Sequence, residues 1–148
     1  IIQFFSVEGI FTVFLHNLQT ILLATSFGLF SLGVLGILLM MLPFSVIGYF
    51  TAAIGGAGIS PWLFFSATVL PHGVLEIPAI VLAGAAILKL GATLSAPAPG
   101  YTISEALLRS LAVWARMMIA IVLPLFLGAA VLEIFITPQA VIYLLGSL

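Results

Sequence analysis

No aspartate, glutamate, lysine or arginine occurs between Glu8 and Glu76, a stretch of 67 residues. Over the whole chain 5% of residues are charged and 64% are hydrophobic, and the mean hydropathy is +1.46. A soluble domain carries about a quarter charged residues, which keep its surface hydrated. The sequence therefore indicates an integral membrane protein.

Hydrocarbon offers no partner to backbone N–H and C=O groups, so spanning segments are helices or closed barrels. The apolar runs are long and lack the alternation of barrel strands, which favours helices. The sequence predicts an all-α, polytopic transmembrane bundle of about four spans, with short interfacial or re-entrant helices and segments broken by proline. We expect a single transmembrane domain over residues 1–148.

Composition excludes several kinds of site. The chain has no cysteine, which rules out disulfides, thiolate metal sites and cysteine nucleophiles. Its formal net charge of -1 argues against nucleic acid, whose binding needs clustered cationic side chains. The sequence contains no glycine-rich phosphate loop, serine elbow or His-Glu-x-x-His motif. We expect no cofactor.

The apolar run from Gly9 to Gly58 is too long for one crossing, since ~1.5 Å per residue gives roughly 75 Å against ~30 Å of hydrocarbon. Pro43 is the strongest helix breaker within it. This predicts one span over about Leu18–Leu42 and a second over about Pro43–Gly58. A turn near Gly33–Gly36 is the alternative.

Two further crossings are predicted, over Pro71–Ala92 and over Met117–Leu132. The stretch Pro61–Leu70 is too short to cross and carries aromatic residues, so we expect an interfacial or re-entrant helix. The stretch Ser95–Gly100, rich in proline, reads as an extramembrane loop. Thr137 and the proline after it predict the start of a short C-terminal helix.

Chain direction sets the depth of the polar side chains. One crossing runs from His72 and Glu76 towards Lys89, and the next returns from Arg116 to Glu133. Glu133 should therefore lie at the level of His72 and Glu76.

The predicted first hairpin brings residues of the first span to the same level. The resulting intramembrane polar cluster consists of Asn17, His72, Glu76 and Glu133, with His16 as an additional candidate. The basic residues Lys89, Arg109 and Arg116 lie on the opposite side, which the positive-inside rule makes cytoplasmic. The polar cluster then faces the extracytoplasmic side, and the loop 95–101 is cytoplasmic.

His72 and Glu76 are four residues apart, so they share one helix face. A carboxylate near lipid is costly unless it is paired, hydrogen-bonded, protonated or hydrated, and it is a functional candidate by default. The favoured interpretation is structural, with the polar cluster locking the helices together. A pathway for an ion, solute or proton is an alternative. A metal site formed by His72, Glu76 and Glu133, with His16 as an additional candidate, is less favoured, and catalysis is the last alternative.

Three segments carry a family resemblance: Pro71-His72-Gly73-Val74-Leu75-Glu76-Ile77-Pro78-Ala79-Ile80, Leu132-Glu133-Ile134-Phe135-Ile136-Thr137-Pro138 and Phe14-Leu15-His16-Asn17-Leu18. They resemble motifs of the stage II sporulation protein M family and occur in the family's order over residues 14–138. The chain departs from the family pattern at Pro43-Phe44, where an Asn-Gly pair is usual.

The resemblance implies a multi-pass protein of the cell envelope. In spore-formers the family member is the membrane scaffold of a complex with two peptidoglycan-degrading enzymes that drives engulfment of the forespore. Many relatives occur in organisms that form no spores.

We therefore expect a non-enzymatic scaffold or assembly component of an envelope complex in the cell membrane. Its expected partners are membrane lipid and other envelope proteins, including peptidoglycan hydrolases, and a homo-oligomer is left open. A channel or transporter component that handles an ion or small solute through His72 and Glu76 is the alternative. A membrane-embedded metal-dependent hydrolase is the third hypothesis.

Overall fold

The computed structural model describes residues 4–145, and every regular element in that part of the chain is a helix. Four helices are long and apolar enough to cross a membrane. The prediction of an all-α bundle with four spans is confirmed. The helices are α1 (Val7–Phe30), α2 (Val34–Gly56), α3 (Pro61–Thr68), α4 (Leu70–Ser95), α5 (Ile103–Met117), the π-helical turn η1 (Met118–Val122), α6 (Leu123–Phe135) and α7 (Thr137–Leu145).

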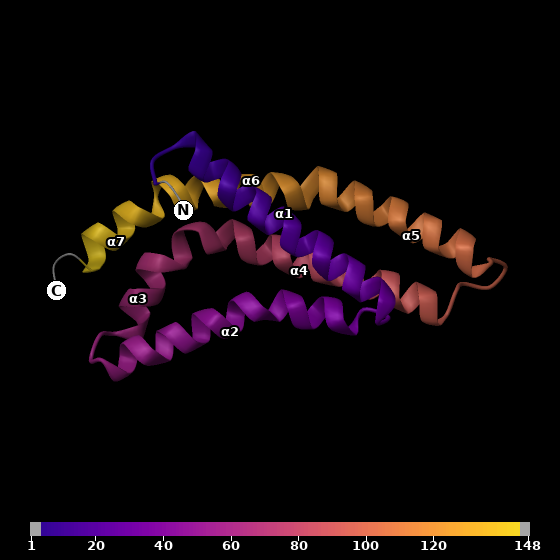
Figure 1. Ribbon diagram of the computed structural model, residues 1–148, viewed down its shortest axis with the longest axis horizontal. Coiled ribbons are helices and arrows are strands. Elements are labelled where there is room, and N and C mark those ends of the chain that lie inside the picture. Colours follow the sequence, from indigo (N-terminus) through magenta and orange to yellow (C-terminus); the bar gives the residue numbers. More distant parts are fainter. Residues whose placement is uncertain (1–3, 146–148) are drawn as a thin grey trace.

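The long helices run up and down between two ends of the bundle (Figure 1). One end, here called the loop end, carries the α1–α2 turn at 31–33 and the α4–α5 connection at 96–102. The other, here called the short-helix end, carries α3, α7 and the start of α1. There the backbone N–H of Phe5 donates to the carbonyl of Ile134, 3.3 Å away, which ties the start of α1 to the end of α6.

The first hairpin does not turn at Pro43, so that prediction is wrong and the alternative near Gly33 is correct. Pro43 lies inside α2, and the chain reverses at Leu32 and Gly33, whose φ values are 54° and 98°. The Gly33 N–H donates to the Gly28 carbonyl at 2.7 Å. This turn divides the apolar run into helices of 24 and 23 residues. Each is about 35 Å long and can cross the bilayer, whereas a proline within a membrane helix is tolerated.

Small residues let the first three long helices approach closely. A Cβ atom on Gly28 or Gly36 would overlap the side chain of Ile87 from α4. A Cβ on Gly91 would collide with the backbone of Leu32, so α4 passes directly against the α1–α2 turn. Such contacts are the usual means by which membrane helices pack.

The core lies around α4. In an apolar stretch of 18 residues within α4, 44% of the residues are buried. The corresponding share for α2 is 6%, so α2 lies at the periphery of the bundle. The largest fully buried side chains are Phe126, Ile21, Ile87, Leu90, Ile134 and Val122. They come from α1, α4, η1 and α6, so these segments form the centre of the bundle.

The last crossing is one continuous helical run, Ile103–Phe135. At ~1.5 Å per residue it is roughly 50 Å long, more than ~30 Å of hydrocarbon, so part of it extends beyond the bilayer. Thr102 caps its start, where its N–H donates to the Glu105 carboxylate at 2.9 Å. The π-helical turn ends two residues before Pro124, whose missing N–H would leave a carbonyl unpaired in a regular α-helix.

Candidate functional site: a polar cluster between helices

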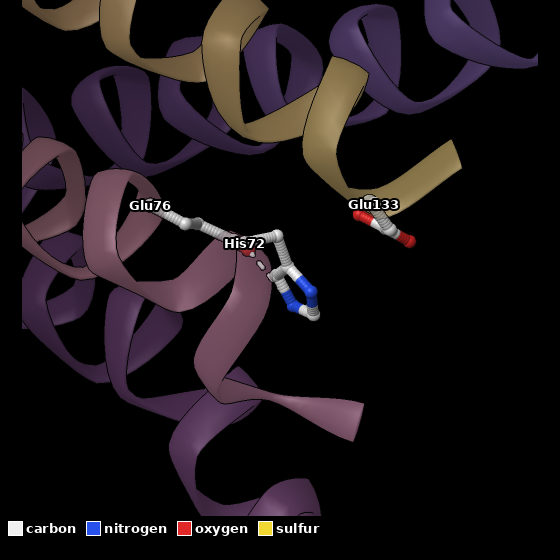
Figure 2. Close-up of side chains that lie close together, drawn as sticks. All are labelled: His72, Glu76 and Glu133. Atoms are coloured by element: carbon white, nitrogen blue, oxygen red, sulfur yellow. Dashed lines mark ion pairs between the residues drawn. The ribbon is translucent and has the colours of Figure 1, made fainter. Parts of the chain in front are cut away.

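Three of the predicted polar residues meet near the short-helix end. His72 and Glu76 lie in the first turns of α4, and Glu133 lies near the end of α6. One ligand atom from each side chain can be chosen so that all three lie within 4.8 Å of one another. Figure 2 shows Glu133 across from the His72 ring, on the neighbouring helix. Antiparallel packing of α4 and α6 thus brings together groups about 60 residues apart in sequence.

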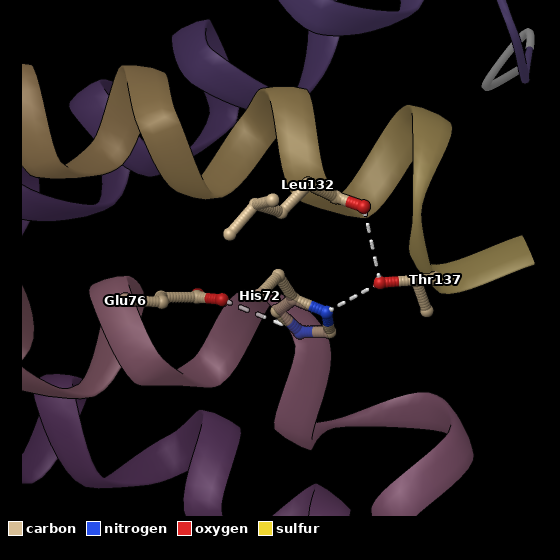
Figure 3. A network of polar contacts seen from close by, with 4 residues as sticks. All are labelled: His72, Glu76, Leu132 and Thr137. Carbon is tan, nitrogen blue, oxygen red and sulfur yellow. Dashed lines mark hydrogen bonds and ion pairs between the residues drawn. The ribbon is translucent and has the colours of Figure 1, made fainter. Parts of the chain in front are cut away.

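Both nitrogens of the His72 ring have polar neighbours (Figure 3). Nε2 lies 3.5 Å from Oε2 of Glu76, one helical turn away. Nδ1 lies 3.1 Å from the hydroxyl of Thr137 at the start of α7. That hydroxyl in turn donates to the backbone carbonyl of Leu132, 3.3 Å away. The ring is therefore fixed between α4, the end of α6 and α7.

Thr137 is the member of this network that sequence reasoning missed as a site residue. Its position before a proline predicted a helix start, and α7 does begin there. Its side chain bonds back to Leu132 and across to His72. The spacing could have indicated this role, because Thr137 lies four residues after Glu133 and residues four apart lie on the same face of a helix.

The cluster opens into a cavity of about 760 Å³ between α1, α2, α4 and α6. Most of the lining is apolar, and its ionisable and amide side chains are those of His16, Asn17, His72, Glu76 and Glu133. All the predicted cluster members therefore line one cavity. His16 is exposed, and no hydrogen bond among the described residues joins Asn17 to His72 or Glu76.

The cavity is lined by two carboxylates, those of Glu76 and Glu133, and by no lysine or arginine among the described residues. The side chains of His72 and Glu76 are 14% and 21% exposed, and Glu133 is half-buried. Among the described residues Glu133 has no hydrogen bond and no ion pair, and Glu76 is the neighbouring carboxylate. Two carboxylates held this close in a partly buried site favour a compensating cation or proton.

The basic residues lie away from the polar cluster. Lys89 and Arg109 line a second, smaller cavity of about 340 Å³ at the loop end. The Arg109 guanidinium carbon lies 4.4 Å from the centre of the Tyr101 ring, and Arg116 donates to the Ala112 carbonyl of its own helix. The three basic residues are thus separated from the polar cluster along the bundle, and the side of the membrane on which each end lies stays a prediction.

Comparison with known proteins identifies the family to which the chain belongs. The family model for stage II sporulation protein M matches residues 5–138, a range that includes all four long helices and every member of the polar cluster. No curated protein and no solved structure gives a match. The chain is therefore a multi-pass membrane protein of the stage II sporulation protein M family.

Proposed function

We propose that this protein is the membrane-embedded scaffold of a cell-envelope complex, on which other envelope proteins assemble. The observation that carries the proposal is the hydrogen bond between His72 and Thr137. It joins the start of α4 to the start of α7, and so fixes the short-helix end to the bundle. A scaffold needs a surface of constant shape, and here a partly buried polar contact supplies the constraint.

The short-helix end is suited to contacts with partners. α3 packs against α7, and both present large side chains outward, with Trp62 79% and Tyr143 82% exposed. Exposed aromatic residues occur at protein interfaces and at the level of lipid headgroups. By analogy with the family's role in spore-formers, the proposed partner is a membrane-anchored peptidoglycan-degrading enzyme.

Site-specific photo-crosslinking in cells tests this role. A photo-reactive residue at Trp62 or Tyr143 should crosslink to a protein with peptidoglycan-hydrolysing activity. The matched control is Val81, which is 61% exposed in the middle of α4 and should crosslink only to lipid. Equal crosslinking from all three positions, or none from Trp62 and Tyr143, would contradict a scaffold that docks partners at this end.

One observation favours a second candidate, a channel or transporter component: the cavity reaches Glu76 and Glu133. The two functions make opposite predictions for Glu76→Gln. If the cluster only supports a scaffold, the variant unfolds at lower temperature or loses its partner, and ion flux into liposomes stays at background. If the cluster conducts, the wild type carries a flux that Glu76→Gln removes while the helical fold survives.

A further inference from the structure

The hydrogen bonds around His72 assign the tautomer of its ring. Thr137 has one hydroxyl proton, and the hydroxyl donates it to the Leu132 carbonyl. With the proton on that bond, the hydroxyl oxygen accepts from His72, and this arrangement of donors assigns the ring N–H to Nδ1. In the neutral ring Nε2 is left with a free electron pair.

That electron pair faces two carboxylates. Nε2 lies 3.5 Å from Oε2 of Glu76, and the donor atoms of His72, Glu76 and Glu133 lie within 4.8 Å of one another. Among the described residues, Nε2 has no other hydrogen-bond or ion-pair partner than Glu76. Three electron-pair donors thus lie close together, an arrangement that a cation would stabilise.

The spacing fits a small divalent ion. Zn²⁺ binds histidine nitrogen and carboxylate oxygen at about 2.0–2.2 Å, which places neighbouring ligand atoms of a tetrahedral site roughly 3.3–3.5 Å apart. The separation of Nε2 and Oε2 is 3.5 Å. Glu133 lies across from the ring on the neighbouring helix (Figure 2), with a donor oxygen within 4.8 Å of the other two ligand atoms, so metal binding would require its side chain to move closer. Three protein ligands leave a fourth position open towards the cavity.

The contact on the other side of the ring is typical of a metal ligand. A histidine that binds a metal through one nitrogen usually donates its other N–H to a fixed acceptor, which holds the tautomer and the ring plane. Thr137 does this for His72, and the Leu132 carbonyl orients Thr137 (Figure 3).

We propose that His72, Glu76 and Glu133 bind one divalent transition-metal ion of the Zn²⁺ class, joining α4 to α6 within the membrane. One imidazole and two carboxylates suit Zn²⁺ or Mn²⁺, whereas Mg²⁺ prefers oxygen ligands and Cu⁺ prefers sulfur. The site goes beyond the scaffold role, because a scaffold can function with or without it. A proton held between His72 and Glu76 is the competing explanation.

Metal titration of the full chain in detergent tests the proposal. The protein is purified without a histidine tag, stripped with a chelator and titrated with Zn²⁺, Mn²⁺ or Mg²⁺, and bound metal is measured by mass spectrometry. We expect one Zn²⁺ per chain and no retained Mg²⁺. A wild-type protein that retains no Zn²⁺ or Mn²⁺ after titration overturns the site and leaves the proton as the cation.

Variants distinguish this site from binding elsewhere. His72→Gln and Glu133→Gln should lose the bound metal, and Thr137→Val should weaken affinity about 10–100-fold through loss of the supporting hydrogen bond. The matched control is Thr12→Val, since Thr12 lines the same cavity but its hydroxyl donates to the Glu8 carbonyl of its own helix, and it should bind as the wild type does. Unchanged Zn²⁺ affinity in His72→Gln overturns the assignment.

Substitution with Co²⁺ gives a readout on the wild-type fold, should a variant aggregate. Bound tetrahedral Co²⁺ with nitrogen and oxygen ligands shows visible absorption bands that excess Zn²⁺ abolishes. The absence of such bands in the folded wild type contradicts the proposed coordination.

Discussion

The side chains of His72 and Thr137 are hydrogen-bonded across 65 residues of sequence, with Nδ1 of the ring 3.1 Å from the hydroxyl oxygen. The same ring contacts Glu76 through its other nitrogen. One side chain at the start of α4 therefore links α7 to the polar cluster. The energetic and functional consequences of this link can be tested separately.

Thr137→Val should destabilise the protein by about 1–3 kcal/mol, because it leaves the His72 N–H without a partner in a partly buried site. Thermal unfolding in detergent, followed by circular dichroism, measures the change. Thr12→Val is the matched control, since the Thr12 hydroxyl donates only to the Glu8 carbonyl of its own helix. We expect a change below about 0.5 kcal/mol there. Equal losses in the two variants would show that the link between α4 and α7 contributes nothing specific.

Gly91→Ala should cost about 1–3 kcal/mol or more, because the added methyl group collides with the backbone of the α1–α2 turn. Gly48→Ala in α2 meets nothing within 4 Å, and should be neutral or stabilising by up to about 1 kcal/mol through helix propensity. The unfolding temperatures of the two variants, measured in the same detergent and compared with that of the wild type, test both predictions. A tolerated Gly91→Ala would mean that α4 does not touch the turn.

Pro43→Ala should raise stability by about 1–3 kcal/mol, because Pro43 lies inside α2 and its missing N–H leaves the Leu39 carbonyl without its helical partner. The alanine restores that bond without altering the hairpin at residues 31–33. The measurement is again the unfolding temperature. A strong loss of stability would indicate that Pro43 makes a turn after all.

Single cysteines can test the orientation of the bundle, since the natural chain has none. Ala57→Cys lies at the short-helix end and Ala98→Cys in the loop 96–102, and both positions are exposed. If the loop end is cytoplasmic, a membrane-impermeant maleimide applied to intact cells should label Ala57→Cys and spare Ala98→Cys. After permeabilisation both should react. The reverse pattern in intact cells would place the polar cluster near the cytoplasm.

Much of the architecture follows from the sequence alone. The uncharged run 9–75 requires lipid as the solvent, and lipid requires helices because backbone groups find no other partners there. The stretch Pro61–Leu70 predicted the short helix α3, and the loop rich in proline at 95–100 predicted the reversal before the last crossing. These features are local, so a short stretch of residues is sufficient to specify them.

The position of the first hairpin could not be read from local signals. Pro43 is the stronger breaker, yet a proline inside a membrane helix loses only one hydrogen bond, whereas a turn there would leave 16 residues for the second span. The close packing of Gly91 against Leu32 and Gly33 favours the turn at 31–33. That contact joins residues almost 60 positions apart, which no local pattern reveals.

The sequence by itself determined that His72, Glu76 and Glu133 should share one depth, because alternating crossings return the chain to the same side of the membrane. Only the tertiary structure decided that they meet within 4.8 Å, that Thr137 holds the His72 ring, and that Asn17 lines the same cavity without a hydrogen bond to them. Depth follows from the count of crossings. Contact depends on how each helix is rotated about its axis, and that rotation is set by packing of the whole bundle.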